Sequence, residues 1–261
     1  LGAEFVRDVN PGEIVVIDDE GMRTYYQQEN CNRRICIFEY IYFARLDSRL
    51  DGVNVYDARL SAGKALAKSY PVDADLVVGV PDSGLAAAMG YAEESGIPFS
   101  LAFHKNSYVG RTFIKPTQEE RESAVQMKLS AIKSVVEGKR IVLIDDSIVR
   151  GTTCRRTIDM LRNAGAKEIH MRVSAPPFVA PCYYGTDIDS ADNLIANHHS
   201  VDEIAKIIGV DSLGYLSLDH AVSLTKMEPD RFCTACFGGG YPTSVPEAGH
   251  KNRFEQKIQR A

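Results

Sequence analysis

Short, continuous apolar runs followed by helical patterns are the feature that most constrains the fold. Leu76–Val80 and Ile141–Ile144 are such runs, and they are typical of strands buried on both faces of a sheet. Helical patterns follow them over residues 85–95 and 152–164. Strands that alternate with helices form parallel β-α-β units with right-handed crossovers. We therefore expect an α/β fold with an open parallel sheet.

The remaining segments extend this alternation. Ser200 and Glu203 form a capping box for a helix that runs through Ile208. The aromatic and β-branched residues of Ile35–Phe43 favour a strand. The other expected elements are a hairpin over 13–26, a helix capped by Asn54, a strand near 98–103, a polar loop over 104–117, a helix from about Glu119 to Val136 and a strand over Glu168–Val173.

Composition places the chain among ordinary globular proteins. Its 261 residues suit one large domain or two small ones, and 44% apolar with 25% charged residues argue against disorder. The net charge of −5 disfavours a nucleic-acid-binding role. Charges interrupt every apolar run before the ~18 residues that a membrane span needs. No signal peptide precedes the fold, so we expect a cytoplasmic protein without a membrane partner.

The chain is expected to have three parts. Residues 1–28 look detached and are interpreted as the end of an upstream domain, so that the chain would be a fragment. Residues 29–225 carry the α/β pattern. Residues 226–261 are rich in glycine and proline, contain a CxxC pair, and are expected to wrap the surface or to be partly disordered.

The candidate chemistry lies where the strands end, because open α/β sheets place their sites at the carboxyl ends of strands. Asp145 and Asp146 directly follow an apolar strand, and the turn over 147–153 supplies a glycine, hydroxyls and a helix N-terminus. Such a turn can hold a phosphate, and the two carboxylates can accept from sugar hydroxyls or hold Mg²⁺. The alternative is that the acid pair only caps the next helix.

The segment Ile141–Thr153 resembles the signature of phosphoribosyltransferases that use phosphoribosyl pyrophosphate. In that family the two acids meet the ribose hydroxyls, and the following loop holds the 5′-phosphate. Val80–Gly84 stands where the family keeps its pyrophosphate loop, although the same residues could form an ordinary turn before a helix. The resemblance implies the type I phosphoribosyltransferase fold.

Further segments narrow the resemblance to the glutamine phosphoribosylpyrophosphate amidotransferases over residues 4–225. These segments are Cys36–Arg45, Val80–Gly84, Lys105–Ile114 and Pro176–Pro177, with Leu46 departing from the proline that the family usually has. The resemblance implies formation of 5-phosphoribosylamine from phosphoribosyl pyrophosphate and ammonia, the first step of de novo purine synthesis. The hairpin would be a remnant of a missing glutaminase domain, because that domain's N-terminal cysteine nucleophile is absent and residue 1 is leucine.

The resemblance assigns roles residue by residue. Lys105 and Arg111 would be catalytic, on a loop that closes over the pyrophosphate, where a solvated basic loop is the alternative. The substrate-binding residues would be Asp82, Ser83, Gly84, Asp145, Asp146, Ser147, Arg150, Gly151, Thr152 and Thr153. Ser83, Asp145 and Asp146 would also hold Mg²⁺.

The six cysteines divide into two groups. Nothing in a chain of this size demands three disulfides, so a metal-binding or redox use of the cysteines is expected, and the CxxC pair at the end has a metal-ligand spacing. The resemblance matches Cys36, Cys182, Cys233 and Cys236 with the ligands of a [4Fe–4S] cluster, with Zn²⁺ or metal-free thiols as alternatives. Cys31 and Cys154 have no role in this pattern, and the adjacent His198 and His199 are expected to be solvated or core residues.

The resemblance also implies partners, and two other functions compete with it. The implied partners are ammonia from the glutaminase domain, purine nucleotides as feedback inhibitors and further copies of the chain. A nucleobase salvage phosphoribosyltransferase would need a hood built for base stacking, which we do not expect residues 174–199 to form. A non-catalytic module that senses phosphoribosyl pyrophosphate would have no use for the cationic loop over 104–115.

Overall fold

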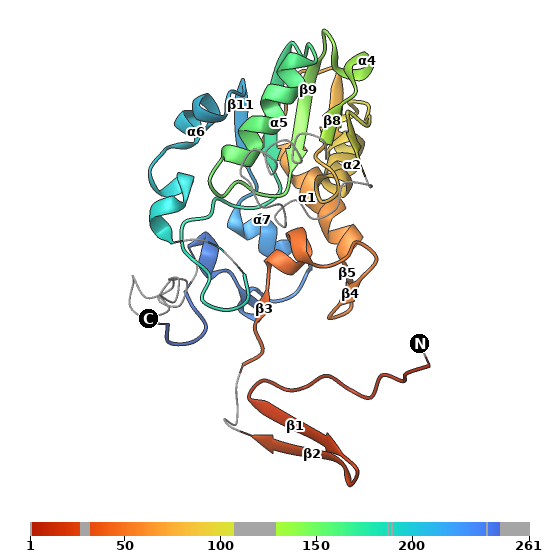
Figure 1. Ribbon diagram of the computed structural model, residues 1–261, viewed down its shortest axis with the longest axis vertical. Helices are drawn as coiled ribbons and strands as arrows, with labels where there is room; N and C mark the ends of the chain where they lie inside the picture. Colours follow the sequence, from red (N-terminus) through yellow and green to blue (C-terminus); the bar gives the residue numbers. More distant parts are fainter. Residues whose placement is uncertain are drawn as a thin grey trace, which may run out of the picture.

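A four-stranded parallel sheet forms the centre of the computed structural model, which describes residues 2–26, 32–106, 129–186, 188, 190–238 and 240–245 (Figure 1). Its strands lie in the order β11–β10–β9–β6. Their bounds are β6 Leu76–Gly79, β9 Arg140–Asp145, β10 Glu168–Val173 and β11 Ser212–Tyr215. The predicted α/β class with an open parallel sheet is confirmed.

The register of the sheet brings its carboxyl ends to one edge. Gly79 of β6 lies level with Ile144 of β9, and Asp145 lies level with Val173 of β10. Val173 in turn pairs with Tyr215 at the end of β11. Residues that follow β6 and β9 therefore start from neighbouring points, although more than sixty residues separate them in the chain.

Helices cover both faces of the sheet. Their bounds are α1 Val55–Ser69, α2 Gly84–Ser95 and α7 Leu218–Ser223 on one face, and α5 Thr152–Asn163 and α6 Val201–Ile208 on the other. Alternate residues of β9 pack against the helices on opposite faces of the sheet. Val142 and Ile144 are buried with α1 and α2, whereas Ile141 and Leu143 are buried with Ile158 of α5.

Helices α1 and α2 touch backbone to backbone. A Cβ on Gly63 would lie 1.8 Å from the carbonyl oxygen of Ala87, and one on Gly90 would lie 1.9 Å from that of Leu60. Larger residues at either position would force the helices apart. The small residues that the sequence shows in both helices are thus what allows their close contact.

Several predicted elements are confirmed. The capping box of α6 is complete, since Ser200 Oγ accepts from the Glu203 N–H and the Glu203 carboxylate accepts from the Ser200 N–H at 2.7 Å. The hairpin consists of β1 Glu13–Asp18 and β2 Gly21–Tyr26, which pair antiparallel. It lies apart from the sheet and its helices (Figure 1). No helix among the described residues is long and apolar enough to cross a membrane.

The prediction of one strand over Ile35–Phe43 is wrong. Strand β3 covers only Ile35–Cys36, and a π-helical turn follows over Glu39–Phe43. The buried Arg59 side chain of α1 explains the turn, because it donates to the carbonyls of Tyr40, Tyr42 and Ala44 at 2.9, 2.9 and 2.8 Å. The hydrogen bonds that these carbonyls accept come from a side chain of another element. The strand propensity of the segment itself cannot predict such bonds.

The predicted helix from Glu119 to Val136 is also wrong over its described part. Residues Leu129–Ala131 form β8, which pairs antiparallel with β7 at Phe103–Lys105, and only Lys133–Val136 is helical, as α4. The strand expected near 98–103 is reduced to a single bridge between Phe99 and Val77 before β7 begins. His104 and Lys105, which were expected to belong to the polar loop over 104–117, are part of β7, and residues 107–128 lie outside the described residues.

The predicted surface tail begins as part of the core. Strand β12, Phe232–Cys233, pairs parallel with β3, and Phe232 and Phe237 are buried. The short elements that complete the fold are the strands β4 Arg49–Leu50 and β5 Val53–Asn54 and the 3₁₀ turns Ala191–Asn193, Ile195–Asn197, Pro229–Arg231 and Ala235–Phe237. Apolar residues, not the glycines and prolines around them, decide where this segment lies.

Candidate functional site

Asp146 joins two loops at the carboxyl edge of the sheet. Its carboxylate is buried and accepts hydroxyl hydrogen bonds from Ser83 and Ser147, each at 2.5 Å. Its own N–H donates to the Asp145 carboxylate at 2.9 Å. Ser83 follows β6 and Ser147 follows β9, so the two predicted strand-end loops meet at one carboxylate.

The loop over Val80–Gly84 lies directly against β9. The Val80 N–H donates to the Ile144 carbonyl at 2.8 Å, and the Gly84 N–H closes the turn on the Val80 carbonyl at 2.9 Å. A Cβ on Gly84 would lie 2.5 Å from the Ile144 carbonyl oxygen. Glycine at this position is therefore what allows Ser83 to reach Asp146.

The acid pair concentrates negative charge in a poorly hydrated place. Burial, and then the neighbouring Asp146 carboxylate, raise the pKa of Asp145 well above its usual range. Burial lowers the pKa of the Arg59 guanidinium. The nearby negative charge of Asp146 raises it and so partly offsets the effect of burial. A bound cation or sugar hydroxyl donors would relieve the repulsion between the two carboxylates.

The turn before α5 ends at a glycine in the left-handed region. Gly151 has a φ of +80°, and a Cβ there would lie 3.0 Å from a methyl group of Ile195. The Arg155 N–H makes the first bond of the helix, to the Gly151 carbonyl, which leaves the amides before it without intrahelical partners. Thr152 and Thr153 are exposed beside these amides. Backbone donors, two exposed hydroxyls and the helix N-terminus are thus within one short segment, a combination that can bind anions.

The predicted loop cations are placed only in part. Lys105 ends β7 and forms an ion pair with Asp82 of the loop after β6, so it lies beside the predicted pyrophosphate loop. Arg150 is exposed in the turn before α5. Arg111 lies outside the described residues.

Sequence reasoning missed Arg59. It occupies the same helical stripe as Val55, Ala62 and Leu66, which are all buried, so a charged residue stands among apolar ones. That placement was the available signal, since a buried arginine must find partners. The structure supplies them as backbone carbonyls of the turn over Glu39–Phe43.

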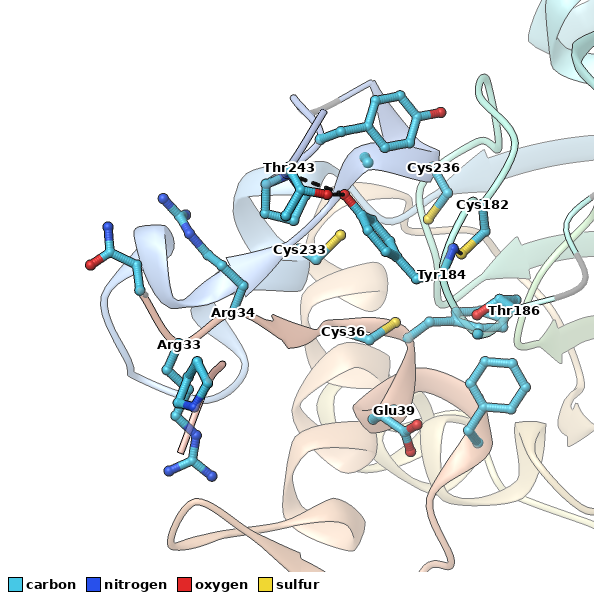
Figure 2. Close-up of a pocket in the computed structure, with 18 of the residues that line it drawn as sticks. Arg33, Arg34, Cys36, Glu39, Cys182, Tyr184, Thr186, Cys233, Cys236 and Thr243 are labelled. Carbon is cyan, nitrogen blue, oxygen red and sulfur yellow. Dashed lines mark hydrogen bonds between the residues drawn. The ribbon is translucent and has the colours of Figure 1, made fainter. Parts of the chain in front are cut away.

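Four cysteines from three segments line one pocket of about 1130 Å³ (Figure 2). They are Cys36 on β3, Cys182 in the loop after β10, Cys233 on β12 and Cys236 in the 3₁₀ turn that follows. Cys36 and Cys233 are direct neighbours in the register of β3 and β12. The four cysteines that the resemblance singled out therefore line the same pocket, although Cys36 and Cys236 are 200 residues apart in the sequence.

The four thiols are free and share an electrostatic environment. Burial raises the pKa of Cys36 and Cys236, and the neighbouring thiols raise it further. The Tyr184 N–H donates to Cys182 Sγ at 3.4 Å. Within the described ranges, no three His, Cys, Asp or Glu side chains meet as they would around a single metal ion.

The other singled-out residues lie elsewhere. Cys154 is buried in the core, where its thiol contacts the Met171 sulfur at 3.1 Å. His198 is exposed, with its Nε2 2.9 Å from the Asp192 carbonyl. Both agree with the structural roles expected for them, and Cys31 lies outside the described residues.

Comparison with known proteins identifies clear relatives. A family model described as a phosphoribosyl transferase domain matches residues 56–212. The amidophosphoribosyltransferase of Bacillus subtilis is 52% identical over 249 residues, which cover 94% of this chain and 52% of the relative. That of Methanothermobacter thermautotrophicus is 54% identical over 246 residues, with 94% and 52% covered. The chain thus spans about half the length of the curated relatives it matches.

A solved structure agrees with these sequence relatives. It is described as the glutamine phosphoribosylpyrophosphate amidotransferase from B. subtilis complexed with ADP and GMP. The match has a TM-score of 0.83 at 52% identity and covers 94% of this chain and 55% of that one. The match thus extends over nearly all of this chain, at an identity that agrees with the sequence relatives.

Proposed function

Because the chain belongs to the phosphoribosyltransferase family, we propose that it forms 5-phosphoribosylamine and pyrophosphate from phosphoribosyl pyrophosphate and ammonia. It would act as the phosphoribosyl-transferring part of an amidophosphoribosyltransferase, in the first step of de novo purine synthesis. The observation that carries the proposal is the hydrogen bonding of Ser83 and Ser147 to Asp146 at the end of β9. It joins the two loops that a substrate with phosphates at both ends requires.

Each part of the substrate has a proposed partner at this edge. The acid pair would accept hydrogen bonds from the ribose hydroxyls, and the turn over residues 147–153 would hold the 5′-phosphate on the amides and hydroxyls that precede α5. The loop over Asp82–Gly84 would hold the pyrophosphate. The distance between the loops is kept short by Gly84, which packs on the Ile144 carbonyl.

Mg²⁺ fits the acid pair. Protein sites for Mg²⁺ commonly offer one or two carboxylates and leave the other positions to phosphates and water, so a set of three protein ligands is not required. Asp145, Asp146 and the Ser83 hydroxyl would hold the ion, which would neutralise charge on the pyrophosphate. The raised pKa of Asp145 is consistent with a site short of positive charge.

The chain's own residues would stabilise the leaving group and exclude water. Ammonia carries a lone pair and needs no strong base, so catalysis depends on charge stabilisation as pyrophosphate departs from the anomeric carbon. Lys105 is proposed for this role because it already lies against the Asp82 loop. Arg111 is proposed for the same role from the resemblance. Water must be kept away from the anomeric carbon because it would compete with ammonia.

Pyrophosphate release driven by ammonium chloride is expected to increase with pH toward ~9. Only unprotonated ammonia can attack, so the rate should increase roughly tenfold per pH unit while ammonium predominates. Ionisation of Asp145 acts in the same direction, since its raised pKa leaves it protonated at low pH. The measurement is pyrophosphate release from phosphoribosyl pyrophosphate with Mg²⁺ across a pH series.

Sodium chloride at the same ionic strength is the control and should release little pyrophosphate. A chain that binds phosphoribosyl pyrophosphate but shows no ammonia-driven release would support the non-catalytic sensing module instead. A requirement for a purine or pyrimidine base as acceptor would support the salvage enzyme.

For the cysteine pocket we propose a [4Fe–4S] cluster held by Cys36, Cys182, Cys233 and Cys236. Around one Zn²⁺ ion, four thiolate sulfurs would lie only ~3.8 Å apart, given Zn–S bonds of ~2.3 Å. The four cysteines line one pocket, yet no three of the described ligand-type side chains meet as around a single ion. The cluster is therefore proposed from the resemblance and from the four thiols that line one pocket. The cluster would fix the segment bearing Cys233 and Cys236 to the body of the protein.

Anaerobically purified protein is expected to contain ~4 iron and ~4 sulfide per chain and to absorb visible light. Cys236→Ser should lose most of both, because three thiolates hold a cluster less well than four. Cys154→Ala is the matched control and should keep them, since Cys154 lies in the core away from the pocket. About one zinc per chain, or folded protein without metal, would contradict the cluster.

Regulation, assembly and domain division are proposed from the same family relationship. The structure of a relative was solved with ADP and GMP bound, which supports purine nucleotides as feedback inhibitors of this chain.

Ammonia from a glutaminase domain and assembly with further copies of the chain are proposed as the resemblance implies. The hairpin over residues 13–26 supports a first part that ends near residue 28, because it lies apart from the sheet (Figure 1).

A further inference from the structure

Asp51 lies at the tip of the short hairpin formed by β4 and β5. The tip is tight, since Asp51 has a φ of +45° and Gly52 one of +83°. The Asp51 side chain is only 13% exposed, although the residue sits in a surface turn. Its carboxylate is therefore directed against other parts of the protein.

Two arginines from distant segments face this carboxylate. Arg33 contacts one oxygen at 2.8 Å, and Arg231 lies 3.6 Å from the other. Arg33 precedes β3, which ends at Cys36, and Arg231 directly precedes β12, which ends at Cys233. One carboxylate thus stands between the starts of the two cysteine-bearing strands.

Strands β3 and β12 need such support. They pair over only two positions, Ile35 with Phe232 and Cys36 with Cys233, and so short a ladder is weak on its own. The Asp51 oxygen nearest Arg231 is buried and has no hydrogen-bond partner among the described residues. The attraction of Arg231 there is a charge interaction across 3.6 Å, which depends on the full negative charge of Asp51.

We propose that Asp51 is a positioning residue for the cysteine pocket, holding Arg33 and Arg231 so that Cys36 and Cys233 stay side by side. Arg33 also reaches Asp8 of the N-terminal segment at 3.4 Å. Residues 9–12 of that segment line the same pocket. Asp51 therefore connects three segments that meet around the four thiols. The proposal rests on the proposed role of the pocket, but its test uses thiols without metal.

The test measures alkylation of each cysteine in the full chain after treatment with chelator and reductant. Iodoacetamide labelling followed by peptide mass spectrometry gives a separate rate for each thiol. Asp51→Asn removes the charge but keeps a residue type that tolerates positive φ. We expect Cys36 and Cys233 to react about 10-fold faster in this variant, because β3 and β12 separate more often. Cys154 in the core reports global unfolding and should not change.

Asp47→Asn is the matched control, because Asp47 pairs with Arg45 at 2.9 Å but is 70% exposed. It should leave all rates within about twofold of wild type. Arg231→Gln should accelerate Cys233 in the same way, and Arg231→Lys should restore the wild-type rate because it keeps the charge.

Unchanged Cys36 and Cys233 rates in folded Asp51→Asn would overturn the proposal, as would equal rates for Arg231→Gln and Arg231→Lys. If Asp51→Asn unfolds as a whole, Cys154 will react faster as well. The comparison of Arg231→Gln with Arg231→Lys then tests whether the charge pair holds β3 and β12 together. Iron and sulfide contents are measured separately, so an absent cluster and a wrong role for Asp51 give different results.

Discussion

Asp146→Asn is expected to weaken binding of phosphoribosyl pyrophosphate with Mg²⁺ by about 100-fold, while the protein stays folded. The substitution keeps the shape of the side chain. It removes the negative charge of the carboxylate, which accepts hydrogen bonds from the Ser83 and Ser147 hydroxyls. The interactions lost on binding would be the charge-assisted hydrogen bonds from the ribose hydroxyls, worth ~1.5–3 kcal/mol each, together with part of the metal site. Titration calorimetry measures the affinity, and pyrophosphate release measures turnover, which should decrease at least as much.

Asp159→Asn is the matched control for this variant. Asp159 lies on α5 beyond the site, is 61% exposed and is 3.9 Å from Arg155. It should bind substrate like the wild type. The unfolding midpoint of both variants should stay within about 3 °C of wild type, which corresponds to ~1 kcal/mol in a chain of this size. Unchanged affinity in folded Asp146→Asn would remove the acid pair from the proposed substrate site.

Gly63→Ala is expected to lower the free energy of unfolding by about 3 kcal/mol. Helix propensity alone predicts the opposite sign, since alanine is favoured over glycine by ~1 kcal/mol in a helix interior. The geometry decides otherwise, because the new Cβ would lie 1.8 Å from the Ala87 carbonyl oxygen and would force α1 and α2 apart. Urea or thermal unfolding measures the change, and the midpoint should decrease by roughly 6–12 °C.

Gly240→Ala controls for the effect of glycine replacement itself. Among the described residues, no atom lies within 4 Å of a Cβ at Gly240, so stability should change by less than about 0.5 kcal/mol. If Gly63→Ala were as stable as wild type, the two helices would be free to separate without loss, and their close packing would not be a source of stability.

Local patterns were sufficient for most of the sheet and its helices. The apolar run of β9 and the capping box of α6 each specify their element through residues within a few positions of one another. Asp145 and Asp146 were placed at a strand end for the same reason. Buried parallel strands show continuous apolar runs because helices cover both of their faces.

The errors arose where distant residues decide the local structure. Ile35–Phe43 has the composition of a strand, but Arg59 from α1 takes up the carbonyls of its second half. Leu129–Ala131 continued a helical pattern in the sequence, but it pairs with β7 instead. In both cases the deciding hydrogen bonds join residues that lie between 15 and about 30 positions apart, beyond the reach of periodicity.

The sequence by itself determined the α/β class, three of the four strands of the sheet and the residue types at the strand ends, because these depend on local apolar patterns and short motifs. Only the tertiary structure decided which residues meet. Ser83 reaches Asp146 because Gly84 lets the loop after β6 lie against β9, and Cys36 stands beside Cys233 because β3 pairs with β12. Such contacts depend on close backbone approach and on charges like that of Asp51, which join segments that local sequence patterns cannot connect.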